Sequence, residues 1–371
     1  MFHKMAELDQ CPICNALHTR SRRFDFPIFR HADFSTVSRS VDLQLCGACG
    51  VVISPMFFPN EKKRFKQLSY RQIGLAGRSK VSSQGGMIRT RASIQVKHIE
   101  KELGRMEPVV LDIGCYDGAL LCELATRYQG AELTGVDVMV SPRKEAAAHE
   151  NLVFSADLDE ALKRKYNLIV ISHTISYLSD LPTILPRLGK ALTEDGVLFV
   201  QMPDVTKNPY YLLMGDQYYT FAPSSLRYVL GLYGFCAGIH DVPEFAREAL
   251  VVARQNHAPA RRQSAGIPGL SEVEAQFEIV SQKISCAKAY DRTGQFGIFG
   301  TTVNAAFVDE LIGNHQTFFV DDDPYWTERS FRGRKVKRPE ELKKTDKVFF
   351  PYGAVTQARV ACRTKAKLVP F

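Results

Sequence analysis

The chain has 371 residues, of which 45% are hydrophobic and 24% are charged, and its formal net charge is +8. This length exceeds what one ordinary hydrophobic core holds, so we expect two or three domains of a globular protein. The longest apolar runs, such as residues 168–171, are far too short to cross a bilayer, and residues 1–10 lack the apolar core of a signal peptide. We therefore expect a cytoplasmic protein without a membrane span.

The basic excess favours an anionic partner, such as a nucleotide-sugar or a nucleic acid. The Lys and Arg residues are dispersed, and no long basic tract with interleaved aromatic residues occurs. Nucleic acid is therefore not the partner we expect.

Four of the nine cysteines form two Cys-x2-Cys pairs near the N-terminus, Cys11/Cys14 and Cys46/Cys49, with 31 residues between the pairs. Four thiolates close a tetrahedral shell, which predicts a structural Zn²⁺ with no open position for water. His18 could replace one cysteine, although its distance from Cys14 fits a zinc knuckle less well. A redox Cys-x-x-Cys would need a thioredoxin-like setting, which this sequence lacks. We expect a zinc-binding module over residues 1–60.

An alternation of strands and helices begins at residue 109 and predicts a parallel α/β sheet. Residues 61–107 are expected to be a helical lead-in, with a polar loop at 74–86 and an amphipathic helix at 88–103. The expected strands and helices of the domain at 61–256 are strands 109–112, 132–137, 152–156, 168–172, 196–202 and 250–253, and helices 119–128, 181–192 and 226–233.

A second, smaller α/β domain is predicted toward the C-terminus. Residues 257–269 are typical of a linker, and a long helix follows to about residue 290, with Ser271 and Glu274 as a capping box. Domain 291–371 then contains expected strands at 296–300, 317–320 and 346–350 and a helix at 303–312. We assign residues 321–323, three consecutive Asp, to a strand-end turn and not to a metal site.

The first strand of the larger domain ends at Asp112, and a turn with Gly114 and Gly118 follows. The next strand ends at Asp137, 23 residues after Gly114, where an acid can hold a ribose diol. The pattern is neither G-x-G-x-x-G nor a P-loop, so dinucleotides and nucleoside triphosphates are disfavoured.

This pattern resembles motif I of the class I S-adenosylmethionine (SAM) methyltransferases. The resemblance implies that the turn passes the methionine part of SAM and that the second-strand acid takes its ribose hydroxyls. We assign Asp157, after the third strand, to the adenine amine or to a helix N-cap. The residues expected at the cofactor are Asp112, Gly114, Cys115, Asp117, Gly118, Asp137 and Asp157.

The whole chain resembles the zinc-containing nucleotide-sugar C-methyltransferases of deoxysugar pathways. The matching segments are 46–52 (CGACGVV), 112–121 (DIGCYDGALL), 135–137 (GVD), 296–300 (FGIFG) and 320–324 (VDDDP). The resemblance implies a Rossmann-like class I SAM domain flanked by a four-Cys zinc module and a small C-terminal Rossmann-like α/β domain. It also implies that both flanking parts help to bind a TDP-sugar.

The acceptor side departs from that family. The family's His after the fourth strand falls on Tyr177, with His173 a few residues earlier, and the family's Glu-His-Phe-Phe segment corresponds to residues 216–219 (DQYY). Gln217 therefore stands at the position of the family's base and cannot take a proton, whereas Asp216 could. The candidates for catalysis are His173, Asp216, Tyr177, Gln217 and Tyr70, which lies in a segment similar to one that faces the acceptor in the family.

We expect transfer of a methyl group to carbon in a nucleotide-linked sugar. One alternative is a SAM-binding protein with changed chemistry, either an O-methyltransferase or a non-catalytic assembly subunit. A weaker alternative is a zinc-containing RNA methyltransferase. Tyrosines expected to line the acceptor pocket, or to belong to the core, are Tyr210, Tyr211, Tyr218 and Tyr219.

Overall fold

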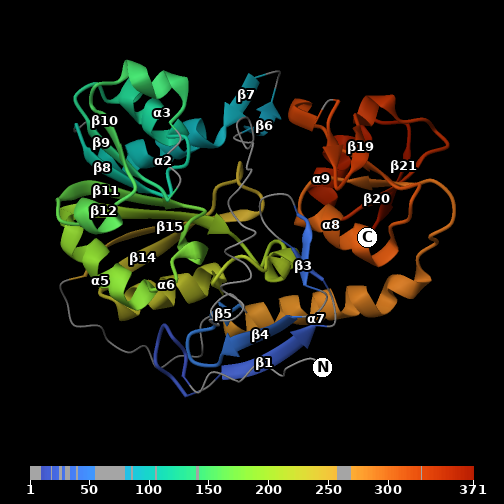
Figure 1. The fold of residues 1–371 in the computed structure, drawn as a ribbon, viewed down its shortest axis with the longest axis horizontal. Coiled ribbons are helices and arrows are strands. Elements are labelled where there is room, and N and C mark those ends of the chain that lie inside the picture. Colours follow the sequence, from blue (N-terminus) through green and yellow to red (C-terminus); the bar gives the residue numbers. More distant parts are fainter. Residues whose placement is uncertain are drawn as a thin grey trace.

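The computed structural model describes residues 10–17, 19–24, 27–29, 34–38, 41–54, 80–84, 87–104, 107–138, 142–256, 269–326 and 328–371. Two α/β units lie side by side, with a small β-sheet and helix α7 beneath them (Figure 1). None of the helices in this described part has both the length and the apolar character needed to cross a lipid bilayer.

The larger unit is built on a seven-stranded sheet of order β10-β9-β8-β11-β12-β15-β14. Its first five strands are parallel, and β15 is antiparallel to both β12 and β14. The predicted parallel sheet is therefore confirmed, but the exposed strand β14 was not predicted. The strands are β8 (Val109–Ile113), β9 (Glu132–Val136), β10 (Leu152–Ser155), β11 (Tyr166–Ser172), β12 (Leu192–Pro203), β14 (Phe235–His240) and β15 (Glu248–Gln255).

Helices pack against both faces of this sheet, so its central strands are buried on both sides. These helices are α2 (Arg91–Leu103), α3 (Ala119–Arg127), α4 (Leu158–Ala161), α5 (Leu181–Ala191) and α6 (Pro223–Leu232). Single 3₁₀ turns elsewhere in the chain are η2 (Lys144–Ala148), η3 (Ile175–Tyr177), η4 (Pro209–Leu213), η5 (Ala287–Ala289), η6 (Pro324–Trp326) and η7 (Pro339–Glu341).

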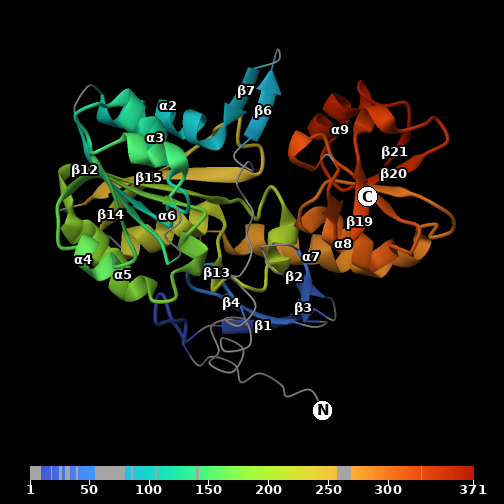
Figure 2. The same ribbon diagram turned by 45° about the horizontal axis from the view of Figure 1, so that its top comes forward.

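The helical lead-in predicted for residues 61–107 is wrong where the structure describes it before α2. Strands β6 (Lys80–Gln84) and β7 (Met87–Thr90) form an antiparallel hairpin, which projects beside the space between the two α/β units (Figure 2). Helix α2 begins only at Arg91, because the Thr90 hydroxyl accepts a hydrogen bond from the backbone N–H of Ser93 at 3.0 Å and caps the helix there.

The N-terminal sheet has the order β1-β4-β5-β13, and its last strand comes from the larger unit. Residues Tyr219 and Thr220 of β13 pair with Ile53 and Val52 of β5. The N-terminal sheet is thereby bonded directly to the larger unit. Its strands are β1 (Thr19–Phe24), β4 (Val41–Cys46), β5 (Val52–Ile53) and β13 (Tyr219–Thr220), and β2 (Ile28–Phe29) and β3 (Thr36–Ser38) pair nearby.

Helix α7 (Leu270–Cys286) leads into the smaller unit. The predicted capping box at Ser271 is wrong, because the N-cap is Gly269, in the left-handed region at φ +75°, and Ser271 lies inside the helix. A Cβ on Gly269 would lie 2.3 Å from Oγ of Ser225, so close packing on α6 decides where α7 begins.

The smaller unit has a six-stranded sheet of order β18-β19-β17-β16-β20-β21. The predicted helix 303–312 is present as α8, and the predicted strands are present as β16, β17 and β20 with slightly shorter bounds. Elements of this unit are β16 (Gly297–Phe299), α8 (Val303–Ile312), β17 (Phe318–Val320), β18 (Ser330–Phe331), β19 (Arg334–Lys337), β20 (Lys347–Phe350), α9 (Ala354–Ala361) and β21 (Lys367–Pro370).

Candidate functional site

The glycine turn after β8 has a backbone that only glycine fits. Gly114 has φ +79°, and its N–H donates to the carbonyl of Val136 at 2.7 Å. A Cβ on Gly114 would lie 1.9 Å from Oγ1 of Thr174, the second residue after β11. Gly118 has φ +78° and forms the N-cap of α3, where a Cβ would lie 2.5 Å from the ring of Phe154. The turn is therefore held close to the ends of β9, β10 and β11.

Two carboxylates flank this turn. Oδ2 of Asp137 accepts a hydrogen bond from the backbone N–H of Tyr116 at 2.9 Å, which ties the end of β9 to the turn. Asp112 is only 3% exposed, and its Oδ1 atom has no hydrogen-bond partner within the described part of the chain. Burial, together with the nearby charge of Asp137, raises the pKa of Asp112 to about 7.

A buried oxygen without a partner needs a donor, and a ligand can supply it. SAM carries an ammonium group as well as ribose hydroxyls, and both are hydrogen-bond donors. The bare backbone at Gly114 and the carboxylates of Asp112 and Asp137 therefore fit this cofactor.

The other predicted cofactor residues lie around the same turn. Asp117 forms an ion pair with Arg143, 2.8 Å between Oδ2 and Nη2, which fixes the segment after β9 to the turn. Cys115 is buried, and burial raises the pKa of its thiol. Asp157 is exposed and caps α4 by accepting from the N–H of Glu160 at 2.9 Å. Its contact with adenine stays a prediction.

A cavity of about 700 Å³ lies beside Asp157. It is formed by the segment after β10 and by the first turns of α5, and its lining includes Ser155, Asp180, Thr183 and Arg187. Open space therefore exists at the carboxyl end of β10.

A partly buried ionic cluster at the same edge of the sheet joins the predicted candidate His173 to Glu248 and Arg91, which were not predicted. Nε2 of His173 is 3.0 Å from Oε2 of Glu248, and Nη2 of Arg91 is 2.7 Å from Oε1 of the same carboxylate. The amide of Gln201 also donates to Oε2 of Glu248. Burial alone would raise the pKa of Glu248, but the charge of Arg91 and the bonds with His173 hold that pKa well below its usual range.

No local signal marks Glu248 in the sequence, because it reaches the site only through the antiparallel strand β15. In the sheet it pairs with Pro203 at the carboxyl end of β12. A second amide supports the cluster from behind, since Nε2 of Gln95 donates to Oε1 of Gln201 at 2.7 Å and to Oγ of Ser172 at 2.9 Å.

Three other residues predicted for catalysis, Asp216, Gln217 and Tyr177, lie near one another. Nε2 of Gln217 is 3.4 Å from the hydroxyl of Tyr177, and the Ser54 hydroxyl of the N-terminal module donates to the Gln217 carbonyl. Asp216 and Gln217 are each 4% exposed. These residues thus lie where the N-terminal module meets the larger unit, and Tyr70 lies outside the described residues.

The tyrosines considered for the acceptor pocket are mostly packing residues. Tyr210 packs against Phe307 of α8 with ring centroids 4.6 Å apart, and the Tyr219 hydroxyl donates to the Ser179 carbonyl at 2.9 Å. Tyr210, Tyr218 and Tyr219 are buried in the large apolar core. The interpretation of these residues as core is the one the packing favours.

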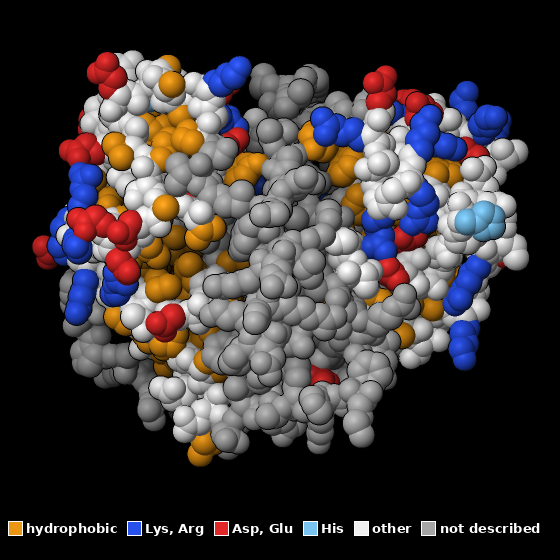
Figure 3. All heavy atoms as spheres, viewed as in Figure 1, with side chains coloured by type: hydrophobic (Ala, Val, Ile, Leu, Met, Phe, Trp, Pro, Cys, Tyr) orange, Lys and Arg blue, Asp and Glu red, His pale blue; other side chains and the backbone are white. Residues whose placement is uncertain are grey.

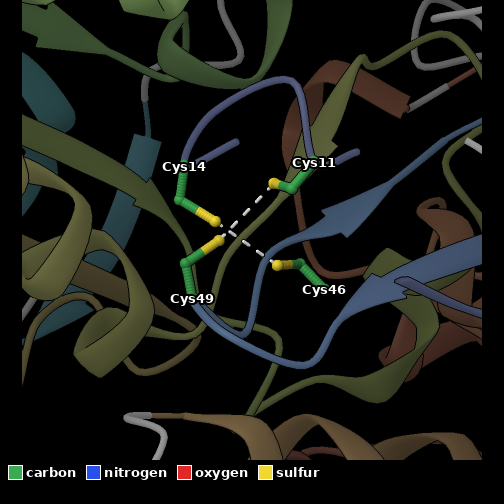
Figure 4. A group of neighbouring side chains, drawn as sticks. All are labelled: Cys11, Cys14, Cys46 and Cys49. Atoms are coloured by element: carbon green, nitrogen blue, oxygen red, sulfur yellow. Dashed lines mark hydrogen bonds between the residues drawn. The ribbon is translucent and has the colours of Figure 1, made fainter. Parts of the chain in front are cut away.

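The four N-terminal cysteines converge on one point (Figure 4). Their sulfur atoms all lie within 4.8 Å of one another, with 3.8 Å between Cys11 and Cys49 and 3.6 Å between Cys14 and Cys46. A tetrahedron with Zn–S bonds of about 2.3 Å has edges of about 3.8 Å, so the spacing fits zinc. The N–H of Ala48 points at Sγ of Cys46 at 3.4 Å, which suits a thiolate ligand. His18 lies outside the described residues.

Residues 88–235 match the family model described as a methyltransferase domain. This part of the chain is therefore similar to methyltransferase domains, and its glycine turn and Asp137 lie within the matched range. Residues 1–87 and 236–371 lie outside that match.

Curated relatives resemble part of the chain. Trans-aconitate 2-methyltransferase of Methylobacterium radiotolerans is 34% identical over 109 residues, which is 29% of this chain and 42% of that protein. Ubiquinone biosynthesis O-methyltransferase of Pseudomonas syringae pv. syringae is 24% identical over 163 residues, or 42% of this chain and 65% of that protein. The chain spans less than two thirds of the length of these relatives.

Among solved structures, the glycopeptide N-methyltransferase MtfA in complex with SAM is 13% identical, and the match covers 43% of this chain and 92% of MtfA with a TM-score of 0.36. The methyltransferase CcbJ from Streptomyces caelestis is 15% identical, and the match covers 45% of this chain and 97% of CcbJ, also with a TM-score of 0.36.

Proposed function

We propose that this protein is a SAM-dependent methyltransferase that acts on a nucleotide-linked deoxysugar. The observation that carries the proposal is the pairing of the left-handed Gly114 turn with the carboxylates of Asp112 and Asp137 inside a methyltransferase domain. When bound, SAM supplies an activated methyl group on a sulfonium centre. The protein then has to align the acceptor, exclude water and accept a proton.

The cofactor side of the site assigns distinct tasks to its residues. The glycine at 114 lets the backbone approach the ligand, and the Asp137 carboxylate accepts from the ribose hydroxyls. The partnerless Oδ1 of Asp112 accepts from the cationic end of the ligand. Buried, charge-assisted hydrogen bonds of this kind each stabilise binding by roughly 1.5–3 kcal/mol.

The choice of a nucleotide-linked sugar rests on the parts outside the matched domain. The four-Cys cluster and the C-terminal α/β unit flank that domain as in the nucleotide-sugar C-methyltransferases that the sequence resembles. The net charge of +8 also suits a diphosphate-bearing substrate. We assign the zinc a structural role, because four thiolates leave no position for substrate.

The atom that receives the methyl group has two candidates. Transfer to carbon, as in the resembling family, needs a base strong enough to form an enolate. Transfer to oxygen is the second candidate, because Gln217 stands at the position of the family's base and is buried against Tyr177. The curated relatives named as O-methyltransferases also favour this second reaction.

Methylation of RNA is the weakest proposal. On the face shown in Figure 3, Lys and Arg are interspersed with Asp and Glu among the coloured residues and do not gather into one basic stripe. Nucleic-acid binding commonly needs such a continuous basic surface.

The decisive experiment combines SAM binding with transfer of a labelled methyl group. Isothermal titration with SAM comes first, and the protein is then incubated with labelled SAM and TDP- or GDP-linked keto-sugars, small carboxylic acids or RNA. We expect labelled nucleotide-sugar by mass spectrometry, and NMR of the product distinguishes a C-methyl from an O-methyl group. Label in a carboxylic acid or in RNA would overturn the acceptor assignment. SAM binding without transfer to any acceptor would indicate an assembly subunit.

A further inference from the structure

We infer that His173 accepts the proton of the acceptor substrate and that Glu248, held by Arg91, is the positioning residue that orients its imidazole. This inference rests on the proposed methyl transfer and adds the proton acceptor that Gln217 cannot provide. Its basis is the ionic cluster of His173, Glu248, Arg91 and Gln201. These residues come from the end of β11, from β15, from the start of helix α2 and from β12.

His173 lies beside the glycine turn. It is the first residue after β11, the strand next to β8 in the sheet. The following residue, Thr174, lies so close to Gly114 that a Cβ there would come within 1.9 Å of its hydroxyl. In open α/β sheets the carboxyl ends of adjacent parallel strands form the ligand-binding edge, and His173 lies at that edge.

The backbone of His173 is held in a conformation that costs energy. Its φ is +55°, in the left-handed region, and its N–H donates to the Gln201 carbonyl at 2.7 Å. A residue with a side chain in this region is strained by roughly 1–2 kcal/mol, and such strain concentrates at functional sites. The conformation turns the side chain toward Glu248, and that side chain stays 24% exposed.

Both oxygens of the Glu248 carboxylate have hydrogen-bond partners. Arg91 takes Oε1, whereas His173 and the Gln201 amide share Oε2. The neighbouring cation keeps the carboxylate ionised, so Glu248 accepts a hydrogen bond but does not take the proton itself. The second amide, Gln95, fixes Gln201 by donating to its oxygen. This arrangement gives the imidazole one fixed partner.

A carboxylate beside one ring nitrogen sets the tautomer of a histidine. With Nε2–H donating to Glu248, the lone pair of a neutral ring lies on Nδ1. That nitrogen can then take a proton, as a histidine held by a buried aspartate does in hydrolytic triads.

The proposed step balances as follows. The O–H or C–H bond of the acceptor breaks, and its proton forms a bond with Nδ1 of His173. The electron pair left on the acceptor atom forms the bond to the methyl carbon that SAM donates, and the pair of the old carbon–sulfur bond leaves with the sulfur. The resulting imidazolium is stabilised by the Glu248 carboxylate, and the proton is later released to solvent.

The first test needs neither substrate nor turnover. Imidazole ¹⁵N NMR of the ¹⁵N-histidine-labelled full chain reports which ring nitrogen carries hydrogen, and His173→Gln identifies the resonance among nine histidines. We expect the Nε2–H tautomer in the wild type and a mixed tautomer in Glu248→Gln. An Nδ1–H tautomer in the wild type would overturn the inference, and this outcome does not depend on whether Glu248→Gln folds.

The second test measures the effect on transfer to the nucleotide-linked keto-sugar. His173→Gln should lower kcat by about 100-fold or more with SAM affinity unchanged, as for loss of a general base. Glu248→Gln should lower kcat and leave the KM for the acceptor unchanged. His315→Gln and Glu123→Gln, both exposed and remote from the cluster, are the matched controls.

The outcomes of the two tests separate the inference from the proposed function. Full kcat in His173→Gln would overturn His173 as the proton acceptor. A higher KM with an unchanged kcat in Glu248→Gln would overturn its positioning role. If the wild type transfers no methyl group to any nucleotide-sugar, the proposed function fails, and the tautomer measurement alone decides the orientation of His173 by Glu248.

Discussion

Glu248 lies 3.0 Å from His173 although 75 residues separate the two in the chain. The contact exists because β15 enters the sheet antiparallel to β12, so its first residue lies where the parallel strands end. An acid from the late part of the chain thus reaches the edge that carries the cofactor turn. The candidate site therefore includes a residue outside the range that matches the family model.

Removal of the Asp137 carboxylate should abolish most SAM binding. Asp137→Ala deletes the acceptor that we assign to the ribose hydroxyls and the acceptor of the Tyr116 N–H. Loss of charge-assisted hydrogen bonds of this kind predicts a 10- to 100-fold weaker affinity, which isothermal titration measures. Glu123→Gln on α3 is the control. Unchanged affinity for SAM in Asp137→Ala would contradict the assignment of the cofactor site.

A single methyl group at the glycine turn should be as damaging as the loss of a functional group. Gly114→Ala meets Thr174 at 1.9 Å and places a side chain at φ +79°. A residue with a Cβ in the left-handed region costs roughly 1–2 kcal/mol. The clash also displaces the turn, so we expect a lower Tm and loss of SAM binding. Gly231→Ala in helix α6, where a Cβ has open space, should instead be neutral or stabilising by about 0.5–1 kcal/mol. Equal effects of the two substitutions would refute this account of the turn.

The cysteine cluster predicts one zinc ion per chain, measurable by elemental mass spectrometry. Cys46→Ser should lower the zinc content and the Tm together, because structural zinc sites contribute about 10–16 kcal/mol of binding energy that is coupled to folding. Cys286→Ser removes an exposed thiol outside the cluster and should change neither. A wild-type protein that is stable and free of zinc after purification without chelator would argue against the site.

From the raised pKa of Asp112 we expect the protein without ligand to become less stable as the pH rises toward neutrality. The pKa of Asp112 is raised from 3.8 to about 7 by burial and by Asp137, so the folded state holds a proton that the unfolded state releases between these pH values. The stability it contributes is complete below pH 3.8 and declines by up to about 1.4 kcal/mol per pH unit until the folded group ionises.

Urea unfolding of wild type and Asp112→Asn at pH 5, 6 and 7 measures this slope. The free energy of unfolding of Asp112→Asn should change less with pH over that range than that of the wild type. Burial likewise raises the pKa of Asp321 to about 6, and this contribution is common to both proteins and cancels in the difference. Parallel curves for the two proteins would show that Asp112 does not titrate in this range.

Most of the features that could be predicted from the sequence are encoded in short contiguous segments. The cysteine pairs come together as predicted because each Cys-x2-Cys pair is a contiguous knuckle. The turn at Gly114 and the helix at 303–312 were recognisable because turn residues and apolar periodicity are encoded within about a dozen neighbouring residues. The parallel order of the central strands followed from the alternation of strands and helices.

Predictions failed where distant residues decide the outcome. The start of α7 depends on the packing of Gly269 against Ser225, so a capping signal at Ser271 could not locate it. The hairpin before α2 and the exposed edge strand β14 carry no distinctive periodicity. Thus the sequence by itself determined the α/β core, the cysteine cluster and the glycine turn after β8, because each depends on short contiguous patterns. Only the tertiary structure decided that Arg91, His173 and Glu248 form one cluster, because their contacts arise from the pairing of strands far apart in the chain.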